Sequence, residues 1–229
     1  MKPSVLIWLV FLPCSGAMAQ VNNRPTVTIE QPVHRITIPA GAPVPYSIRV
    51  TDPEDGDSRY EEISSAEVML LIKPLRDTTG LKHHQKMTEE LLPGLFSLRA
   101  ANCLSCHAAQ TPLIGPSFAA LASRYTIRDV ELLARKIRSG GSGTWGDTLM
   151  PAHPDLPVQE AQELAKWIIT RFSASGMDFK SGITGVFRVS ASVNGGACLL
   201  LAAYRDHGSA SDKVEKTGVA MQLVTVRKD

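Results

Sequence analysis

The run Cys103-Leu-Ser-Cys106-His107 constrains this chain more than any other feature, because it places two cysteines and a histidine within five residues. A C-x-x-C-H run is the attachment motif of c-type haem: two thiolates bond to the vinyl groups and the histidine reaches the iron. A zinc site would need a second ligand pair, and a thioredoxin-like pair would need a surrounding βαβ pattern. The only other cysteines are Cys14 and Cys198. The motif therefore predicts one covalently attached haem.

The amino-terminal segment has the pattern of a secretory signal peptide. Lys2 precedes the apolar residues 5–12, and small residues follow up to Ala19. Such a segment is removed on export, and cleavage after Ala19 would take Cys14 with it. No later segment approaches the roughly 18 unbroken apolar residues of a membrane span. Residues 1–19 are predicted to be a cleaved signal peptide and the mature protein to be soluble and periplasmic; a leader retained as an anchor is the alternative.

Charge and length limit what the remaining chain does. The 24 Lys and Arg residues nearly balance the 22 Asp and Glu residues. The net charge is therefore too small to favour binding to nucleic acid or to a membrane surface. Removal of the leader leaves about 210 of the 229 residues, which is more than one small haem domain needs. A second structural unit is therefore expected.

Residues 88–172 have the pattern of helices joined by loops. Apolar residues at positions 127, 130, 133 and 137 recur with the spacing of one buried helix face. Pro157 begins a last helix that contains Trp167. Between these two helices lies the loop 143–154, in which Met150 directly precedes a proline.

Met150 is the predicted second axial ligand of the iron. Its thioether sulfur is a soft, neutral donor that suits ferrous iron and raises the reduction potential relative to more basic ligand pairs. The alternative is that Met150 fills a gap in the core, although helical packing does not require a methionine in this loop. His153 of the same loop and an open sixth position are two further alternatives.

Together these motifs resemble the class I cytochrome c family. The resemblance covers about the central 90 residues and rests on four features in the family's order: the C-x-x-C-H run, Ile114-Gly-Pro-Ser-Phe118, Leu149-Met150-Pro151 and the closing helix with Trp167. Trp145 also resembles an aromatic residue that some members place near a haem propionate, with ordinary packing as the alternative.

The resemblance assigns a role to five residues of the candidate site. It implies that Cys103 and Cys106 form the thioethers, that His107 and Met150 are the axial iron ligands, and that Pro116 supports the proximal side. The expected contact is a hydrogen bond from the second imidazole nitrogen to the Pro116 carbonyl, which would fix the ring tautomer.

The two flanks are predicted to be all-β. Short apolar runs such as residues 27–30 and 44–50 precede the helical region, and residues 186–193 and 197–204 follow it as an expected hairpin. Neither flank is large enough to bury a stable core alone, so the two are expected to join. Together they supply about seven strands, and their opening strands resemble a bacterial immunoglobulin-like (Ig-like) sandwich.

The predicted fold class is a multidomain chain, in which an all-α class I cytochrome c domain is inserted in, or flanked by, an all-β Ig-like sandwich. The expected boundaries are residues 20–76 and 176–229 for the two parts of the sandwich and 77–175 for the cytochrome domain. Insertion at a loop tip is tolerated when the loop ends lie close together. Two separate small β-modules are the alternative.

Other residues have weaker functional interpretations. The acidic turn at residues 52–57 has oxygen ligands for calcium but lacks the EF-hand spacing, and a solvated turn is the alternative. Cys198 is interpreted as a core residue. Two predicted helices carry a group of cationic residues that could form a docking patch for an acidic redox partner. The alternative is that they are only the solvated faces of these helices. The residues are Arg124, Arg128, Arg135, Lys136 and Arg138.

The predicted function is single-electron transfer by a periplasmic monohaem cytochrome that is not itself an enzyme, since no titratable pair near the haem motif suggests substrate chemistry. A resemblance to cytochrome domains of bacterial periplasmic sugar dehydrogenases implies a quinoprotein dehydrogenase as electron donor and a respiratory oxidase chain as acceptor. One alternative is a carbohydrate- or protein-binding β-module that carries a haem. Another is a small haem peroxidase or sensor, which would need an open or displaceable sixth ligand.

Overall fold

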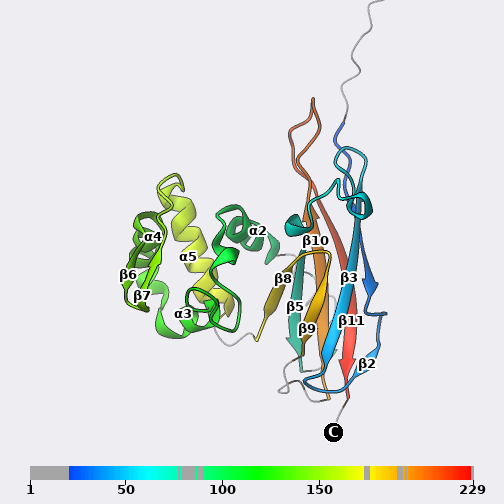
Figure 1. Ribbon diagram of the computed structural model, residues 1–229, viewed down its shortest axis with the longest axis horizontal. Helices are drawn as coiled ribbons and strands as arrows, with labels where there is room; N and C mark the ends of the chain where they lie inside the picture. Colours follow the sequence, from blue (N-terminus) through cyan, green and yellow to red (C-terminus); the bar gives the residue numbers. More distant parts are fainter. Residues whose placement is uncertain are drawn as a thin grey trace, which may run out of the picture.

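The computed structural model describes residues 21–76, 90–172, 176–189 and 195–227, together with the single residues 78, 86 and 193. The predicted signal peptide, residues 1–19, lies outside the described residues. Two β-sheets stand beside a helical region, residues 90–172 (Figure 1). In the described part of the chain, no helix has both the length and the apolar character needed to cross a bilayer.

Each sheet combines strands from before and after the helical region. The first sheet contains β1 (Thr26–Gln31), β3 (Pro43–Asp52), β4 (Gly56–Asp57) and β9 (Thr184–Arg188). The second sheet has the order β2 (Thr37–Ile38), β11 (Thr217–Val226), β10 (Ala197–Arg205), β5 (Met69–Leu75) and β8 (Asp178–Ser181). The helical region lies in the chain between β5 and β8, two strands that pair with each other.

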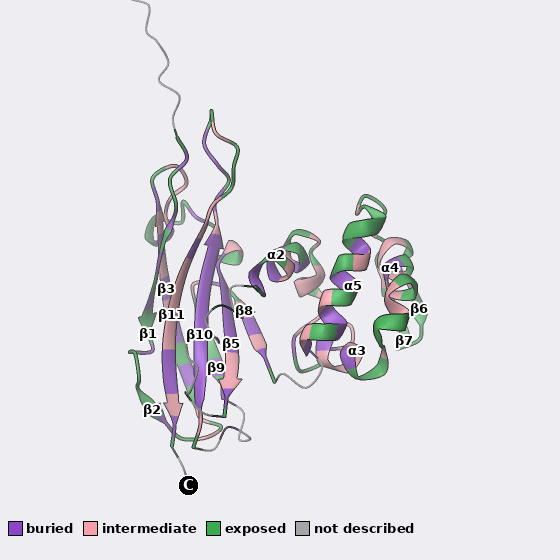
Figure 2. Ribbon diagram, turned by 180° about the vertical axis from the view of Figure 1, so that it is seen from behind, coloured by how far each residue is buried: buried purple, intermediate pink, exposed green. Residues whose placement is uncertain are grey.

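Strand burial shows that the second sheet is covered on both faces. In β3 every second side chain is buried, as expected for a strand with one face on the core. In β10 residues 197–204 are all buried, and β5 and β10 are purple along most of their length in Figure 2. A strand with no exposed face must be packed from both sides.

The two faces of the second sheet belong to different cores. Successive strand residues point to opposite faces, and in β5 Leu70 and Ile72 belong to the core between the sheets, here named the sandwich core. Met69 and Leu71 belong to a second core that includes Leu95 and is here named the helical core. The second sheet therefore lies between the first sheet and the helical region.

The helical region begins with α2 (Leu92–Ala100) and the short 3₁₀ helix η3 (Cys103–Ser105). It continues with α3 (Phe118–Arg124), η4 (Ile127–Asp129), α4 (Val130–Ser139) and α5 (Val158–Phe172). The Thr126 side chain and Asp129 form a capping box at the start of η4, which satisfies backbone donors at that helix end. Two further 3₁₀ helices, η1 (Ser58–Tyr60) and η2 (Ser65–Glu67), lie between β4 and β5.

The predicted all-α cytochrome domain is wrong. Between α4 and α5 the chain forms a hairpin of β6 (Gly141–Gly143) and β7 (Gly146–Met150), and the whole structure is 29% helix and 34% strand. The reason is the glycines around the turn: Gly140, Gly141, Gly143 and Gly146 all have positive φ. Glycine adopts this conformation without the steric cost of a side chain, so the chain reverses and Gly141 pairs with Met150.

The predicted strand arrangement of the flanks is also corrected. The described flanks contain nine strands instead of about seven, because β4 and β8 are short and carry little apolar pattern. The expected hairpin of residues 186–193 and 197–204 is absent from the described part: β9 pairs with β3 in the first sheet, whereas β10 lies between β5 and β11 in the second. The domain boundaries at residues 76/77 and 175/176 stay a prediction.

Candidate haem-binding site

The C-x-x-C-H motif forms a tight turn directly after α2. Asn102 adopts a left-handed conformation with φ of 56°, which ends the helix and starts η3. The backbone N–H of His107 then donates to the Cys103 carbonyl at 3.0 Å. Asparagine tolerates this conformation better than most residues. The turn brings the two cysteines and the histidine to the wall of one cavity.

That cavity has a volume of about 360 Å³ and receives residues from every helix of the region except the 3₁₀ helix η4. Its walls are largely apolar and include Leu98, Leu121, Leu133, Ile137 and Ile168. All six site residues predicted from the sequence line it, namely Cys103, Cys106, His107, Pro116, Trp145 and Met150. The fold thus brings together residues that are up to 47 positions apart in the chain.

The imidazole of His107 is held from one side by the loop that follows it. Its Nδ1 lies 2.7 Å from the carbonyl oxygen of Pro116, the contact expected from the sequence. Because a carbonyl only accepts, Nδ1 carries the proton, and Nε2 of the neutral ring keeps its lone pair. A Cβ atom on Gly115 would come within 2.5 Å of the imidazole Cε1. The loop can therefore approach the ring this closely only with glycine at that position.

The loop itself is anchored to the motif. The Cys106 carbonyl accepts hydrogen bonds from the N–H groups of Ile114, at 3.1 Å, and Gly115, at 2.8 Å. The Ala108 carbonyl accepts another from the N–H of Phe118 at 3.0 Å. These hydrogen bonds join the two ends of the segment 106–118, so the backbone fixes the position of Pro116 relative to His107.

The two motif cysteines are unpaired thiols. Burial raises the pKa of the Cys103 thiol to about 11, because a thiolate loses solvation in an apolar site. Before haem is attached, the Cys103 thiol is therefore uncharged at neutral pH, which suits the apolar wall of the cavity.

Met150 reaches the cavity from the end of β7. A Cβ atom on Gly140 would come within 2.5 Å of the Met150 carbonyl oxygen, so the hairpin packs tightly against the end of α4. Beyond Met150, the Arg138 Nε donates to the Leu156 carbonyl at 2.8 Å, and the same guanidinium donates to the Pro154 carbonyl at 3.2 Å. The segment that carries Met150 is therefore fixed on both sides.

Trp145 lines the cavity, and two of the cationic residues contact other parts of the helical region. The Trp145 side chain is 42% exposed, and the guanidinium of Arg124 lies over its ring, 5.0 Å from the centroid. Arg138 is engaged with the loop carbonyls described above. Two members of the proposed cationic patch thus have structural partners inside the helical region.

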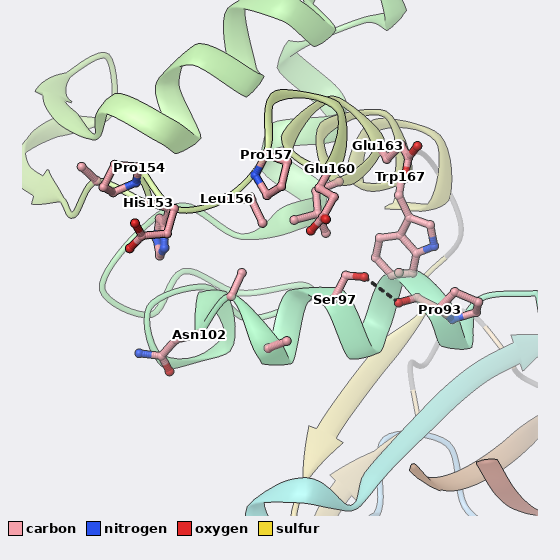
Figure 3. A pocket seen from close by; sticks show the side chains of 16 residues that line it. Pro93, Ser97, Asn102, His153, Pro154, Leu156, Pro157, Glu160, Glu163 and Trp167 are labelled. Atoms are coloured by element: carbon pink, nitrogen blue, oxygen red, sulfur yellow. Dashed lines mark hydrogen bonds between the residues drawn. The ribbon is translucent and has the colours of Figure 1, made fainter. Parts of the chain in front are cut away.

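His153, the alternative axial ligand, lines a different hollow. This groove has a volume of about 940 Å³ and lies between α2 and the start of α5 (Figure 3). Its other lining residues include Asn102, Glu160 and Trp167. The backbone N–H of His153 donates to the Ile137 carbonyl at 3.2 Å. The structure therefore places Met150, and not His153, among the residues of the motif cavity.

The acidic turn at residues 52–57 is occupied by protein donors. Asp52 Oδ1 accepts the backbone N–H groups of Glu54 and Asp55 at 2.9 and 2.8 Å, and Asp57 forms a 2.7 Å ion pair with Arg49. Among the residues that the structure describes, no group of three or more His, Cys, Asp or Glu side chains is arranged to hold a metal ion. The calcium interpretation has no structural support in this turn.

Cys198 lies in the sandwich core with 1% of its surface exposed. Burial raises the pKa of its thiol to about 12, which keeps it protonated and unreactive at neutral pH. It belongs to the packing of β10, far in sequence from the motif cavity.

The chain was compared with known proteins. No family model matches it. A cytochrome c-552 from Nitrosomonas europaea is 38% identical over 71 residues, which are 30% of this chain and 69% of the relative. A cytochrome c-551 from Azotobacter vinelandii is 39% identical over 74 residues, 31% of this chain and 89% of the relative. The crystal structure of the wild-type Nitrosomonas europaea protein matches at 35% identity with a TM-score of 0.32, covering 33% of this chain and 96% of that one.

Over about a third of its length, this chain belongs to the cytochrome c-551/552 family. Members of the family carry covalently bound haem c, and haem c is the cofactor of this chain. The residues fit the group: one apolar cavity presents two thiols, an imidazole with a free Nε2 and a thioether. These matches leave about two thirds of this chain without a counterpart in either relative.

Proposed function

We propose that this protein is a periplasmic monohaem cytochrome that passes single electrons between redox partners. The observation that supports the proposal most strongly is the composition of one cavity wall: Cys103, Cys106, His107 and Met150 converge there from two separate elements. This is the donor set that haem c needs, two thiols for attachment and two axial ligands. Bound haem supplies reversible one-electron chemistry between ferrous and ferric iron.

The chain's own residues bind and tune the group. Cys103 and Cys106 would hold the haem through thioether bonds, and His107 Nε2 and the Met150 thioether would bind its iron, while the Pro116 carbonyl fixes the imidazole tautomer. A hydrogen bond at Nδ1 makes the other ring nitrogen a better ligand. The thioether of Met150 favours the reduced state.

The apolar walls of the cavity have a second role. They exclude water and lower the local dielectric, which favours the iron state of lower charge. With His107 and Met150 as its two protein ligands, bound haem iron would have no open coordination position for a substrate, which suits electron transfer. The electron-carrier interpretation therefore agrees with the placement of Met150 better than the peroxidase or sensor interpretation does.

The mouth of the cavity is suited to brief contact with other proteins. Ile114, Trp145 and Leu149 line the cavity and are 61%, 42% and 69% exposed, and the neighbouring Leu113 is also exposed. Exposed apolar side chains grouped around a site mark interaction surfaces. We assign the donor to a sugar or quinoprotein dehydrogenase and the acceptor to a respiratory oxidase chain. This assignment rests on the resemblance of the sequence to dehydrogenase-linked cytochromes.

The ligand assignment is tested by replacing Met150 with alanine in the haem-loaded protein. Loss of the thioether is expected to remove the weak long-wavelength absorption band of sulfur-ligated ferric haem and to let carbon monoxide bind the ferrous form. Met221→Ala is the matched control, because Met221 lies on β11 outside the cavity. Unchanged absorption and unchanged carbon monoxide binding in Met150→Ala would contradict the assignment.

A further inference from the structure

The aromatic side chains next to His107 come from three different elements of the fold. Phe118 of α3 stacks on the His107 ring, with centroids 5.6 Å apart and planes at 29°. Phe118 also stacks on Phe172 of α5 at 5.2 Å and contacts Phe179 of β8 at 5.9 Å. Phe172 and Phe179 meet edge to face at 6.0 Å. The three phenylalanines form one cluster, whose member Phe179 belongs to the second β-sheet.

This cluster has little freedom to rearrange. Phe118, Phe172 and Phe179 are 1%, 2% and 7% exposed. Their centroid distances lie in the range in which aromatic pairs attract each other beyond simple burial. Close-packed side chains transmit a change in one member to its neighbours, so the position of Phe118 depends on the ring of Phe179.

A hydrogen bond ties the same two segments together. Gln110 Nε2 donates to the Met177 carbonyl at 2.5 Å. Gln110 lies three residues after His107, and Met177 lies two residues before Phe179. The bond therefore joins the segment that carries His107 to the segment that carries Phe179.

The sheet also contacts the helix that precedes the motif. The guanidinium of Arg205, at the end of β10, lies 4.4 Å from the ring centroid of Phe96 in α2. Arg99 of the same helix forms a 3.5 Å ion pair with Glu67, the last residue of η2, two residues before β5 begins. The second sheet therefore contacts the chain both before Cys103 and after His107, and its helical face is continuous with the packing around the proximal ligand.

We propose that Phe179 is a positioning residue for the proximal ligand and that the β-sheet, through it, sets the electronic properties of the haem. Pro116 fixes which imidazole nitrogen carries the proton, whereas Phe118, backed by Phe179, fixes the rotation of the ring. Groups that orient a metal-bound histidine tune the metal itself. The inference rests on the proposed function of His107 as an axial ligand, and it gives the second sheet a role in the redox site.

The experiment compares Phe179→Leu with Phe187→Leu in the full-length, haem-loaded protein. Both residues are buried phenylalanines of the β-sheets, but Phe187, which is 1% exposed, lies in the sandwich core, and the second sheet separates this core from the helical region. The measurements are the midpoint potential and the hyperfine-shifted haem methyl resonances of the oxidised protein, which report the orientation of the axial imidazole. The thermal unfolding midpoint is recorded for each variant.

Phe179→Leu is expected to shift the midpoint potential and to redistribute the methyl resonances, while haem content and the long-wavelength band stay at the wild-type level. Phe187→Leu is expected to lower the unfolding midpoint and to leave both redox measurements unchanged. Wild-type values in Phe179→Leu, or equal shifts in the two variants, would overturn the proposal. If Phe179→Leu does not fold, Phe179→Met, which keeps more of the volume, replaces it with the same criteria.

The same data separate this proposal from the proposed function. A wild-type protein that lacks covalent haem or a reversible one-electron couple refutes the proposed function and removes the basis of the inference. A wild-type protein with a normal couple, combined with an unaffected Phe179→Leu variant, refutes only the role of Phe179.

Discussion

The sandwich core and the helical core lie on opposite faces of the same sheet, but their side chains fill them differently. Between the sheets, alternate apolar residues of facing strands pack against each other, as in β3 and β5. In the helical region, side chains from α3, α4 and α5 surround a cavity of about 360 Å³ lined by the haem-binding residues. The sandwich is completed by its own side chains, whereas the helical region is completed by its cofactor.

The largest expected effect comes from removing both thioether bonds with Cys103→Ser and Cys106→Ser. Without its haem, the walls of the cavity of about 360 Å³ lose the atoms that they pack against, and the free energy of unfolding of the helical region is expected to fall by several kcal/mol. Hydrogen exchange measured by mass spectrometry is expected to show loss of protection in α3, α4 and α5, while β3 stays protected.

The matched control for this double variant is Cys198→Ala, which alters a cysteine of the sandwich core and leaves the motif intact. It is expected to lower protection in β10 without loss of haem. If the double variant kept full protection in the helical region, or lost it equally in both cores, the contrast between the two cores would be wrong.

A smaller effect is expected at the contact of α2 with α5. A Cβ atom on Gly94 would overlap the indole of Trp167, so Gly94→Ala forces the two helices apart. Overpacking of this kind costs about 1–3 kcal/mol, measured as the free energy of unfolding in denaturant. Ser97→Ala, which truncates an exposed residue three positions later in α2, is the control and is expected to stay within about 0.5 kcal/mol of wild type. Equal free energies of unfolding for Gly94→Ala and wild type would contradict close packing of α2 against Trp167.

The smallest expected effect depends on pH and lies at the end of the sandwich. His207 is flanked by Asp55 and Glu67, each 3.2 Å from one ring nitrogen. Partial burial lowers the pKa of His207, but the hydrogen bond to Asp55 and the charges of Glu67 and Asp55 outweigh it and raise the pKa above 6.5.

A raised pKa in the folded state means that protonated His207 stabilises the fold. This contribution is complete below about pH 6.5 and is lost as the pH rises through the folded-state pKa. The thermal unfolding midpoint of wild type is therefore expected to fall across this interval, and the fall is expected to be reduced in His207→Gln. An identical pH profile in the two proteins would contradict the role of His207, while the midpoint potential is expected to be the same in both.

The cavity residues were predictable because local sequence positions them. The C-x-x-C-H turn and the loop to Pro116 are held by hydrogen bonds that join residues at most ten positions apart, such as Cys106 and Gly115. Glycine and proline at residues 115 and 116 indicate the loop directly. The sequence predicted Met150 as the ligand, with His153 of the same loop as an alternative, and the backbone path of that loop places Met150, but not His153, on the wall of the motif cavity.

The sheet that contacts the helical region was less predictable. Strand β8 has four residues and one fully apolar side chain, Phe179, so it shows no alternation of its own. The apolar run at residues 197–204 indicates burial on both faces, but the sequence does not show what covers the second face. The Gly-rich turn at residues 194–196 favours a hairpin locally, yet β9 pairs with β3 because its apolar Phe187 faces the sandwich core.

The most direct test of the account is a spectroelectrochemical titration of the purified full-length protein. One haem per chain is expected, bound through thioethers, with a single reversible one-electron transition and the long-wavelength band of sulfur-ligated iron in the oxidised state. Absence of covalent haem, or a ferrous form that binds carbon monoxide without any change at Met150, would contradict the assignment of His107 and Met150 as the axial ligands of an electron carrier.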